Sequence, residues 1–522
     1  MKKLIATVAV AAVSAAMAEV KVSEIFSDNM VLQRGRPVPV WGVADPGEKV
    51  RVAFRGACVE GVAGADGRWE VRLPPQDVLK KGADLSVNDR KFRNVLVGDV
   101  WLCSGQSNMA YTRARGVNEG AADIFNPIID EAKTNDLVRE TWFRWVKRPL
   151  PWDTPVNGPW NRCGGGSTAV GYLFAREIVA RTGIPVGILH NAWSGCSIEP
   201  YIPLEGFKSV PQLKQVADKL ERDQAKLRTP EGLKAYRAHI DKMLQWAKQV
   251  EADRAAGIEY DRIPEVFLPA DTRNSVQYNA MVNPIIRFPI AGAIWYQGES
   301  NSPDLYRYKL HALVNGWRAK WGYEFPFYIV QLAAYTAPTD DPAGGNGYAR
   351  NREEQWIASK EIANSGIAAA IDIGMADNIH PYNKADVGAR LALWALRDVY
   401  GFSDIVVSGP QMTSAKAEGD RMRIRFDYVG SGLVAAEKPD PNRATQPVPC
   451  ADGKLKGFAV SGADRKWFWA DAAIDGDTVV VSSKDVPKPV AVRYAYRANP
   501  MGNANLYNRE GLPALPFRSD CW

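Results

Sequence analysis

Two patterns of apolar and polar residues divide the chain. Residues 19–94 carry short runs in which apolar and polar positions alternate, separated by turn pairs such as Pro46-Gly47 and Asp66-Gly67. Alternation with a period of two is typical of half-buried strands, and pairs containing Gly or Pro mark the turns between them. The pattern predicts a small β-sandwich domain over 19–94.

From residue 95 the alternation gives way to continuous apolar runs of strand length, at 95–103, 185–189, 291–296, 325–331 and 367–373. Segments with helical spacing lie between them. Val170, Leu173 and Ile178 share one helix face after a Ser167 or Thr168 N-cap, and a similar face follows the last run. Apolar strands alternating with amphipathic helices are typical of a parallel sheet that helices cover on both faces. We therefore predict an α/β domain over 95–401.

The remaining sequence adds an insertion and a third domain. Charged residues with helical spacing fill about 206–260, which predicts a surface helical hairpin inserted in the α/β domain. After residue 401 short β-like runs return, at 421–426, 455–460, 467–470, 478–482 and 491–496. They predict a C-terminal β domain over 402–522.

The first 18 residues follow neither pattern. Lys2 and Lys3 precede an apolar run that ends in Ala16-Met17-Ala18. A charged start, a short apolar run and a small-x-small ending are typical of a secretory signal peptide. The apolar run is too short to span a bilayer. We expect cleavage before Glu19, a secreted or periplasmic protein, and no membrane span.

Composition narrows the classes of function. The 522 residues are 46% hydrophobic and 24% charged, which excludes a disordered chain or a coiled coil. The net charge is +6, or +4 without Lys2 and Lys3, and the basic residues form no stripe, so nucleic acid is not expected as a partner. The six cysteines are far apart and form no CxxC pair, so neither a metal site nor another cofactor is predicted. Both disulfides and free thiols remain open.

Small and polar residues follow four of the five predicted strands, at 104–109, 193–197, 297–301 and 377–381. In an open parallel sheet, ligands bind at the carboxyl ends of the strands. One such segment is typical of a turn and no more. Four segments at the same edge of a sheet predict an active site there.

These segments supply the parts of a serine esterase. Ser107 lies on a tight strand-to-helix turn beside Gly105 and is the candidate nucleophile. His380 follows Asp377 by three residues, so we expect the imidazole to act as the base and the carboxylate to orient it. The backbone N–H groups of Ser107 and Gly195, with the side-chain amide of Gln297, are the candidate oxyanion donors.

The same segments resemble a known family. GDVWLCSGQSNM, NAWSGCSIEPY, IWYQGESN and DNIHPYNKADVGARLAL look like the conserved blocks of the sialate O-acetylesterase family, within the SGNH-type hydrolases. FSDNMVLQRGRPVPVWGVADPGEKV resembles that family's leading β domain. The resemblance implies an SGNH/flavodoxin-like three-layer domain with a parallel sheet, with Ser107 of GQSN as nucleophile and His380 of IHP as base. The chain departs from the family at Ser194, where a second glycine is more common.

Alternatives stay open for residues, activity and substrate. Ser104 shares the turn of Ser107, and Asp372 ends the last strand much as Asp377 follows it. A non-catalytic carbohydrate-binding protein is the hypothesis from another class of function. The substrate implied by the resemblance is an O-acetylated sialic acid, and the alternative is an acetylated plant polysaccharide, xylan or xyloglucan.

Recognition of a sialic acid calls for an aromatic surface and a cation. Aromatic rings suit sugar rings, and a carboxylate needs a cation or several N–H donors. The aromatic residues near the predicted rim are Trp193, Tyr201, Trp295 and Tyr296, and the cations are Arg113, Arg115 and Lys384. The sequence does not choose among them.

Overall fold

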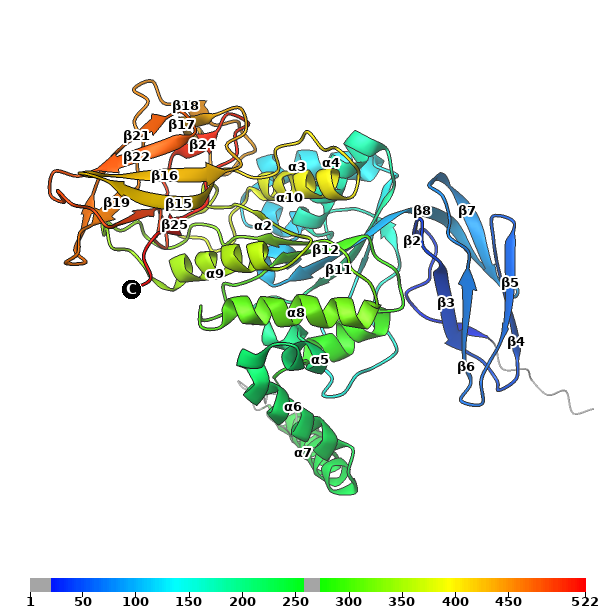
Figure 1. Ribbon diagram of the computed structural model, residues 1–522. Helices are drawn as coiled ribbons and strands as arrows, with labels where there is room; N and C mark the ends of the chain where they lie inside the picture. Colours follow the sequence, from blue (N-terminus) through cyan, green and yellow to red (C-terminus); the bar gives the residue numbers. More distant parts are fainter. Residues whose placement is uncertain (1–19, 258–272) are drawn as a thin grey trace, which may run out of the picture.

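The computed structural model describes residues 20–257 and 273–522 (Figure 1). The predicted signal peptide and the end of the predicted insertion lie outside the described residues. Within those two ranges no helix is both long and apolar enough to cross a membrane. All six cysteines are free.

A seven-stranded path through the central sheet holds the predicted strands, in the order β10-β9-β11-β8-β12-β13-β14. The bounds are β8 Arg90–Gly105, β9 Val138–Trp142, β10 Asn161–Arg162, β11 Val186–Ala192, β12 Gly292–Tyr296, β13 Phe327–Val330 and β14 Ser365–Ala368. β9, β11, β8, β12, β13 and β14 run parallel, and β10 is antiparallel at the edge. Four of the predicted apolar runs are confirmed as β8, β11, β12 and β13. The fifth, 367–373, overlaps β14 only at 367–368, because that strand ends at Ala368.

The sequence pattern missed β9 because it reads VRETW, with charged residues at its centre. Arg139 and Glu140 are nonetheless buried, and Glu140 Oε1 lies 3.1 Å from His190 Nδ1 on the neighbouring β11. A partner on the next strand makes a polar residue compatible with a central strand. Hydropathy along one strand does not show such a partner.

Helices cover both faces of the sheet. α4 (Ala169–Thr182) and α10 (Lys384–Asp398) pack over Cys103, Ile188 and Ile294 on one face. α8 (Tyr306–Trp321) and α9 (Gly347–Glu361) contribute to the core on the other face, with Leu102 and Trp295. Successive residues of a strand thus belong to different cores, because their side chains alternate between the two faces of the sheet.

Capping residues set where α4 and α10 begin. The Thr168 side chain accepts a hydrogen bond from Gly171 N, which confirms one of the two predicted caps, and Asn383 accepts from Asp386 N. The two helices touch at Gly388, where a Cβ would lie 2.7 Å from Leu173 Cβ. α10 therefore starts at a fixed place just after the segment that contains His380.

The N-terminal region continues into the central sheet. β1 (Lys21–Val22), β3 (Val38–Val43) and β6 (Arg68–Leu73) form one sheet. β2 (Val31–Gln33), β4 (Lys49–Phe54), β5 (Ala57–Val62) and β7 (Leu79–Val87) join the first half of β8. The predicted boundary at 94/95 thus falls inside β8, whose second half is a central strand of the α/β region (Figure 1).

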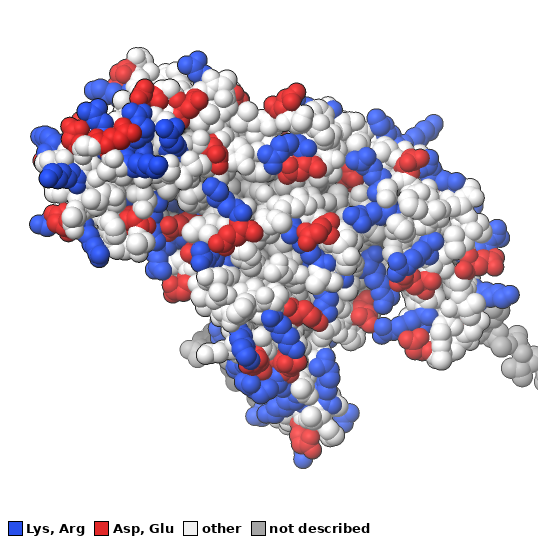
Figure 2. All heavy atoms as spheres, viewed as in Figure 1, with Lys and Arg blue, Asp and Glu red and all other residues white. Residues whose placement is uncertain are grey.

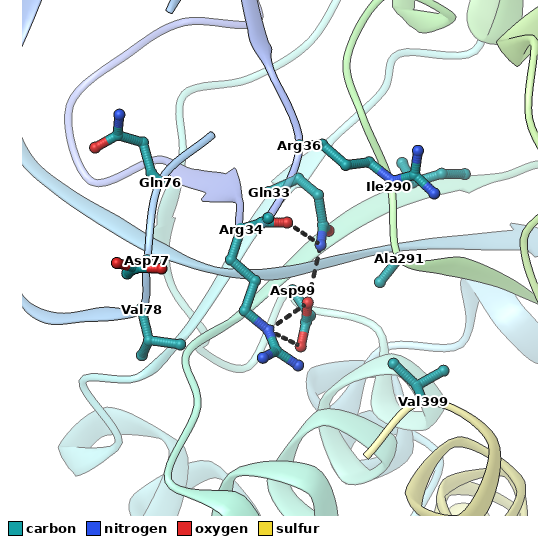
Figure 3. A pocket seen from close by; sticks show the side chains of 11 residues that line it. Gln33, Arg34, Arg36, Gln76, Asp77, Val78, Asp99, Ile290, Ala291 and Val399 are labelled. Atoms are coloured by element: carbon teal, nitrogen blue, oxygen red, sulfur yellow. Dashed lines mark hydrogen bonds and ion pairs between the residues drawn. The ribbon is translucent and has the colours of Figure 1, made fainter. Parts of the chain in front are cut away.

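An ionic contact marks the junction of these two parts. A cavity of about 330 Å³ lies there, and Gln33 and Arg34 both reach Asp99 at its wall (Figure 3). Arg34 Nε lies 3.0 Å from both Asp99 carboxylate oxygens, and Gln33 Nε2 lies 2.9 Å from one of them. Asp99 pairs with Val186 at the start of β11, whereas Gly105 pairs with Ala192 at its end. This cavity is therefore at the opposite edge of the sheet from Ser107.

Residues after 401 form three further sheets. Their strands are β15 (Gln411–Glu418), β16 (Arg421–Asp427), β17 (Leu433–Glu437), β18 (Val448–Pro449), β19 (Phe458–Ser461), β20 (Trp467–Trp469), β21 (Asp471–Asp475), β22 (Thr478–Ser482), β23 (Ala491–Tyr494), β24 (Leu506–Asn508) and β25 (Phe517–Arg518). Arg352 of α9 docks this region by donating to the carbonyls of Arg497 and Ala498, each at 2.6–2.7 Å. The Lys438–Asp386 ion pair, at 2.6 Å, ties it to the start of α10.

The predicted helical insertion protrudes from the molecule (Figure 1). Its projecting part is the hairpin of α6 (Lys214–Leu227) and α7 (Pro230–Ala255), whereas α5 (Leu204–Lys208) before it packs against α8 and contributes Phe207 to the core. Cations and anions are interspersed on the projecting hairpin of α6 and α7 (Figure 2). Ion pairs such as Lys214–Asp218 and Lys219–Asp223 account for part of this pattern, as expected for a solvated helix face.

Candidate active site

The nucleophile turn follows directly from the end of β8. Gly105 has φ +137°, and a Cβ there would lie 2.2 Å from the Tyr296 carbonyl oxygen, so only glycine fits. Gln106 N donates to that carbonyl at 2.9 Å, and Ser107 then begins the short helix α1 (Ser107–Ala110). Ser107 is 8% exposed. Within the described ranges its hydroxyl and N–H have no hydrogen-bond partner, so both are free to act on a substrate.

Asn108 joins this turn to the segment that contains His380. Its amide Nδ2 donates to the Ile379 carbonyl at 3.0 Å and to Glu299 Oε1 at 2.5 Å. Its Oδ1 accepts from Lys384 Nζ. Ser107 and His380 are the immediate neighbours of two residues that are hydrogen-bonded to each other. The structure thus places the segments that carry the predicted nucleophile and the predicted base next to each other.

The environment of His380 is cationic. Arg115, on α2 (Arg113–Asn118), lies 3.3 Å from His380 Nδ1 through its Nη2. Because a guanidinium only donates, Nδ1 is the acceptor, and the neutral ring carries its proton on Nε2. Glu119 holds Arg115 at 2.7 Å and also accepts from the Tyr111 hydroxyl at 2.6 Å. Burial, together with Arg115 and Lys384, lowers the pKa of His380 to about 4.

Asp377 is exposed, on the same loop as His380. The loop is shaped by Asn378, whose Oδ1 accepts from His380 N at 2.9 Å. Among the described residues, no carboxylate lies within hydrogen-bond distance of the His380 ring. The assignment of Asp377 as the residue that orients the base therefore stays a prediction.

Gly195 lies in the loop after β11 and is exposed, with φ +69°. Its N–H has no hydrogen-bond partner in the part of the chain that the structure describes, as the predicted oxyanion role requires. The loop is held to the nucleophile turn by Trp193 N, which donates to the Gly105 carbonyl at 3.0 Å. The Cys196 thiol donates to the Trp193 carbonyl at 2.9 Å and closes the turn around Gly195.

Gln297 is fully buried between the three loops. Its Nε2 lies within 3.2 Å of three acceptors, which are Gln106 Oε1, the Cys196 carbonyl and Asn301 Oδ1. The Tyr306 hydroxyl donates to its Oε1 at 2.6 Å. An amide nitrogen has only two hydrogens, so this amide is engaged in holding the loops together. Its role as a third oxyanion donor stays a prediction.

A buried ionisable pair lies beneath the site. Lys384 is 1% exposed and lies 4.9 Å from the Tyr111 ring centroid. Burial lowers the pKa of Lys384 to about 7 and raises that of Glu299. Asn108 contacts both groups and so supplies the polar partner that each buried group needs. Sequence reasoning took Glu299 as a support for the loop, but found no role for Asn108.

The competing residues are engaged elsewhere. Ser104 donates its hydroxyl to the Asn191 carbonyl at 2.6 Å, and Asp372 forms a bidentate ion pair with Arg390 at 2.7 Å. Asp372 therefore belongs to a buried ion pair after β14, which ends at Ala368. Burial raises the pKa of the Cys196 thiol to about 12, so a reactive thiolate is not available beside the site.

The rim differs from the sequence-based expectation. Tyr201, Trp295 and Tyr296 are fully buried in the core, and of the four predicted aromatic residues only Trp193 is partly exposed. Trp145, which follows the missed strand β9, stacks on Trp193 with ring centroids 5.4 Å apart. Of the three candidate cations, Arg113 and Lys384 are buried, and Arg115 contacts His380.

Comparison with known proteins gives matches along most of the chain. Residues 268–397 match the family model described as carbohydrate esterase, sialic acid-specific acetylesterase. The chain is 27% identical to the sialate O-acetylesterase of Mus musculus, over 94% of this chain and 93% of that protein. It is 26% identical to the human sialate O-acetylesterase, over 94% and 91% respectively.

A solved structure is similar over the whole length. The crystal structure of a carbohydrate acetylesterase from Xanthomonas citri superimposes with a TM-score of 0.76 at 32% identity. The alignment covers 97% of this chain and 100% of that chain. Its extent includes the N-terminal strands, the central sheet and the sheets after residue 401.

Proposed function

Because the chain belongs to the sialic acid-specific acetylesterase family of carbohydrate esterases, and is therefore a carboxylic ester hydrolase, we propose that it removes O-acetyl groups from sialic acids. The proposal includes the finer fold assignment, an SGNH/flavodoxin-like three-layer domain between two β domains. The observation that carries the mechanism is the free Ser107 hydroxyl on a turn that Asn108 holds against the residue before His380.

The chemistry follows the serine esterase scheme. Ser107 Oγ attacks the acetyl carbonyl while His380 takes its proton, and the negative oxygen is stabilised by Ser107 N–H and Gly195 N–H, with the Gln297 amide as the predicted third donor. The sugar alcohol leaves with the proton from His380, and an acetyl-serine remains. Water, deprotonated by His380, then releases acetate and restores Ser107.

Asp377 is proposed to orient His380 through Nδ1. This requires the carboxylate to take the position at which Arg115 now donates, and the ring proton to lie on Nδ1 instead of Nε2, so that Nε2 is free to accept the Ser107 proton. Catalytic hydrogen bonds often form only with substrate bound. Asp377→Asn should then lower kcat by about 10²- to 10⁴-fold with little change in KM. An unchanged kcat removes Asp377 from the mechanism and leaves the Ser107–His380 pair.

Ser107→Ala tests the function itself. The variant should lose at least about 10³-fold in acetate release from an O-acetylated sialic acid, because the acyl-enzyme cannot form. Its circular dichroism and thermal unfolding should match those of the wild-type protein. Near-normal turnover by the folded variant contradicts the assignment of the nucleophile.

Simple assays distinguish the two candidate substrates, and they distinguish an esterase from a non-catalytic binding protein. Acetate release from acetylated sialic acid and from acetylated xylan, measured side by side, decides between the proposed substrate and the plant polysaccharide. Hydrolysis of p-nitrophenyl acetate by the wild-type protein, abolished in Ser107→Ala, excludes the non-catalytic carbohydrate-binding protein.

Export is also part of the proposal. It rests on the Lys2-Lys3 start, the apolar run and Ala16-Met17-Ala18, which lie outside the described residues. N-terminal sequencing of protein from the periplasm or the medium should read Glu19-Val20-Lys21. A chain retained in the cytoplasm with Met1 intact contradicts it.

A further inference from the structure

An aromatic and cationic surface lies beside the active-site loops and is not used by the mechanism above. It follows β9, where the chain reads WFRWVKRPLPW over 142–152. The segment is held in place by its backbone. Phe143 N donates to the His190 carbonyl at 3.1 Å, and Arg148 N donates to the Val276 carbonyl at 3.1 Å. Its side chains are thus presented by an anchored segment.

Trp145 is exposed yet fixed. More than half of the residue, 53%, is exposed. Its indole N–H donates to the Ala192 carbonyl at 2.9 Å, and its ring lies nearly parallel to that of Trp193, at 15°. An indole whose polar group is satisfied and whose orientation is set presents apolar surface to a ligand at little cost in side-chain entropy.

This stacked pair belongs to the edge of the site. Trp193 N donates to the carbonyl of Gly105, two residues before Ser107, and Trp193 lies two residues before Gly195. A ring seated on Trp145 and Trp193 is therefore next to the loops that carry the nucleophile and an oxyanion donor.

The charged residues of segment 142–152 are all cations. Lys147 Nζ lies 5.0 Å from the centroid of the Trp193 ring, and Arg144 and Arg148 are in the same segment. Among residues 20–257 and 273–522, no carboxylate forms an ion pair with any of these three cations. A ligand with a carboxylate supplies the missing anion, and a neutral sugar does not.

We infer that Trp145, Trp193 and Lys147, called here the aromatic subsite, bind the ring and the carboxylate of an acidic sugar whose acetyl ester lies at Ser107. The inference rests on the proposed function and names the residues that read its substrate. The apolar face of the sugar ring packs on the indoles, and Lys147 binds the carboxylate. The alternative occupant, a neutral acetylated xylan chain, uses the indoles alone.

Two pairs of variants test the subsite with matched controls. Trp145→Ala is compared with Trp142→Ala, another exposed tryptophan in the same segment (44%). Lys147→Gln is compared with Arg144→Gln, which removes a nearby cation that lies over Trp142. For each variant, kcat/KM is measured on acetylated sialic acid, on its methyl ester and on p-nitrophenyl acetate.

The expected result is selective. Trp145→Ala should lower the ratio of sialate to p-nitrophenyl acetate turnover about tenfold, and Lys147→Gln roughly three- to tenfold. Lys147→Gln should also abolish the preference for the free acid over its methyl ester, and added salt should raise the wild-type KM for the free acid only. Trp142→Ala and Arg144→Gln should keep the wild-type ratios.

Failure of the subsite is distinguishable from failure of the proposed function. Titration calorimetry with Ser107→Ala measures the binding of acetylated sialic acid without hydrolysis. Loss of this binding when Lys147→Gln is added to Ser107→Ala supports the subsite. An unchanged ratio in both Trp145→Ala and Lys147→Gln overturns the subsite. If Trp145→Ala lowers turnover of acetylated xylan and Lys147→Gln changes no rate, the inference that Lys147 binds a carboxylate is wrong. A wild-type protein without esterase activity on any of these esters refutes the proposed function itself.

Discussion

The charge near His380 decides the pH range over which that residue accepts a proton. Its pKa is lowered to about 4 by burial, by Arg115 and by Lys384, whereas a free histidine titrates near 6.5. The proton-accepting form is therefore present above about pH 4 and is lost as the pH falls through that value. A base with this environment keeps working in mildly acidic surroundings.

We predict that kcat/KM on p-nitrophenyl acetate falls on the acid side with a midpoint near pH 4. Arg115→Met should move this midpoint toward 6.5, because it removes a cation that disfavours the imidazolium. Arg115→Lys keeps the charge and serves as the control. Circular dichroism across the same range separates the titration from acid unfolding. An acid limb at the same pH in Arg115→Met contradicts the role given to Arg115.

Asn108 is a positioning residue, because it acts through its neighbours. Asn108→Ala should lower kcat about 10- to 100-fold with a smaller change in KM, since the His380 segment loses its tie to the nucleophile turn. It should also cost about 1–3 kcal/mol of stability for each buried group left unpaired, Lys384 and Glu299 among them.

The matched control for Asn108 is Asn508→Ala. Asn508 is also fully buried and donates to two carbonyls, those of Ser408 and Tyr428, in the C-terminal region. This variant should lose stability with no loss of kcat per folded molecule. Equal effects on kcat in the two variants would reduce Asn108 to a purely structural role.

For the strands, helices and their loops, a sequence motif indicates where residues lie, but not what they contact. The loops after β8, β11 and β12 and the loop before α10 were found because glycine, serine and amide residues follow apolar runs. The contacts of Asn108 with Ile379 and of Arg115 with His380 join segments about 270 residues apart, and no periodicity encodes them. Trp145 was missed because β9 was missed, since its buried charges hid the strand.

Packing between α4 and α10 gives a further prediction. Gly388→Ala places a Cβ 2.7 Å from Leu173 Cβ and 2.8 Å from Phe174 N, so one helix has to shift. We expect a loss of about 1–3 kcal/mol in the free energy of unfolding, measured by denaturant titration. At Gly347, the first residue of α9, a Cβ meets nothing within 4 Å. Gly347→Ala should therefore be neutral or slightly stabilising, and an equal loss in both variants argues against the contact.

Across the whole protein, the N-terminal strands and the region after residue 401 both contact the central α/β region. The N-terminal strands and the central sheet contribute to one continuous core, and Arg34 with Asp99 closes their junction. Asn383, the cap of α10, donates to the carbonyls of Pro441 and Arg443 in the C-terminal region. The region after residue 401 therefore helps to fix the helix that follows His380.

This arrangement predicts that the catalytic region is not released as a stable piece. Limited proteolysis should cut the protruding α6–α7 hairpin before it cuts the connections near residues 94 and 402. The first connection lies inside β8, and the second is a short turn whose backbone is hydrogen-bonded to the end of α10 through Phe402 N and the Leu396 carbonyl. Mass spectrometry of the fragments and activity of the nicked protein provide the measurement. Early accumulation of an intact, active fragment of about 95–401 contradicts it.

The single long strand β8 also sets an order for synthesis on the ribosome. It is the first strand of the parallel sheet to be made, and its two neighbours there, β11 and β12, come about 80 and 190 residues later. Its first half can pair at once with β7, while its second half, Asp99–Gly105, waits for β11 and β12, the strands that pair with it on its two sides. The nascent protein thus exposes an unpaired strand edge during much of its translation. Its yield in the cell depends on protection of that edge from association with other chains.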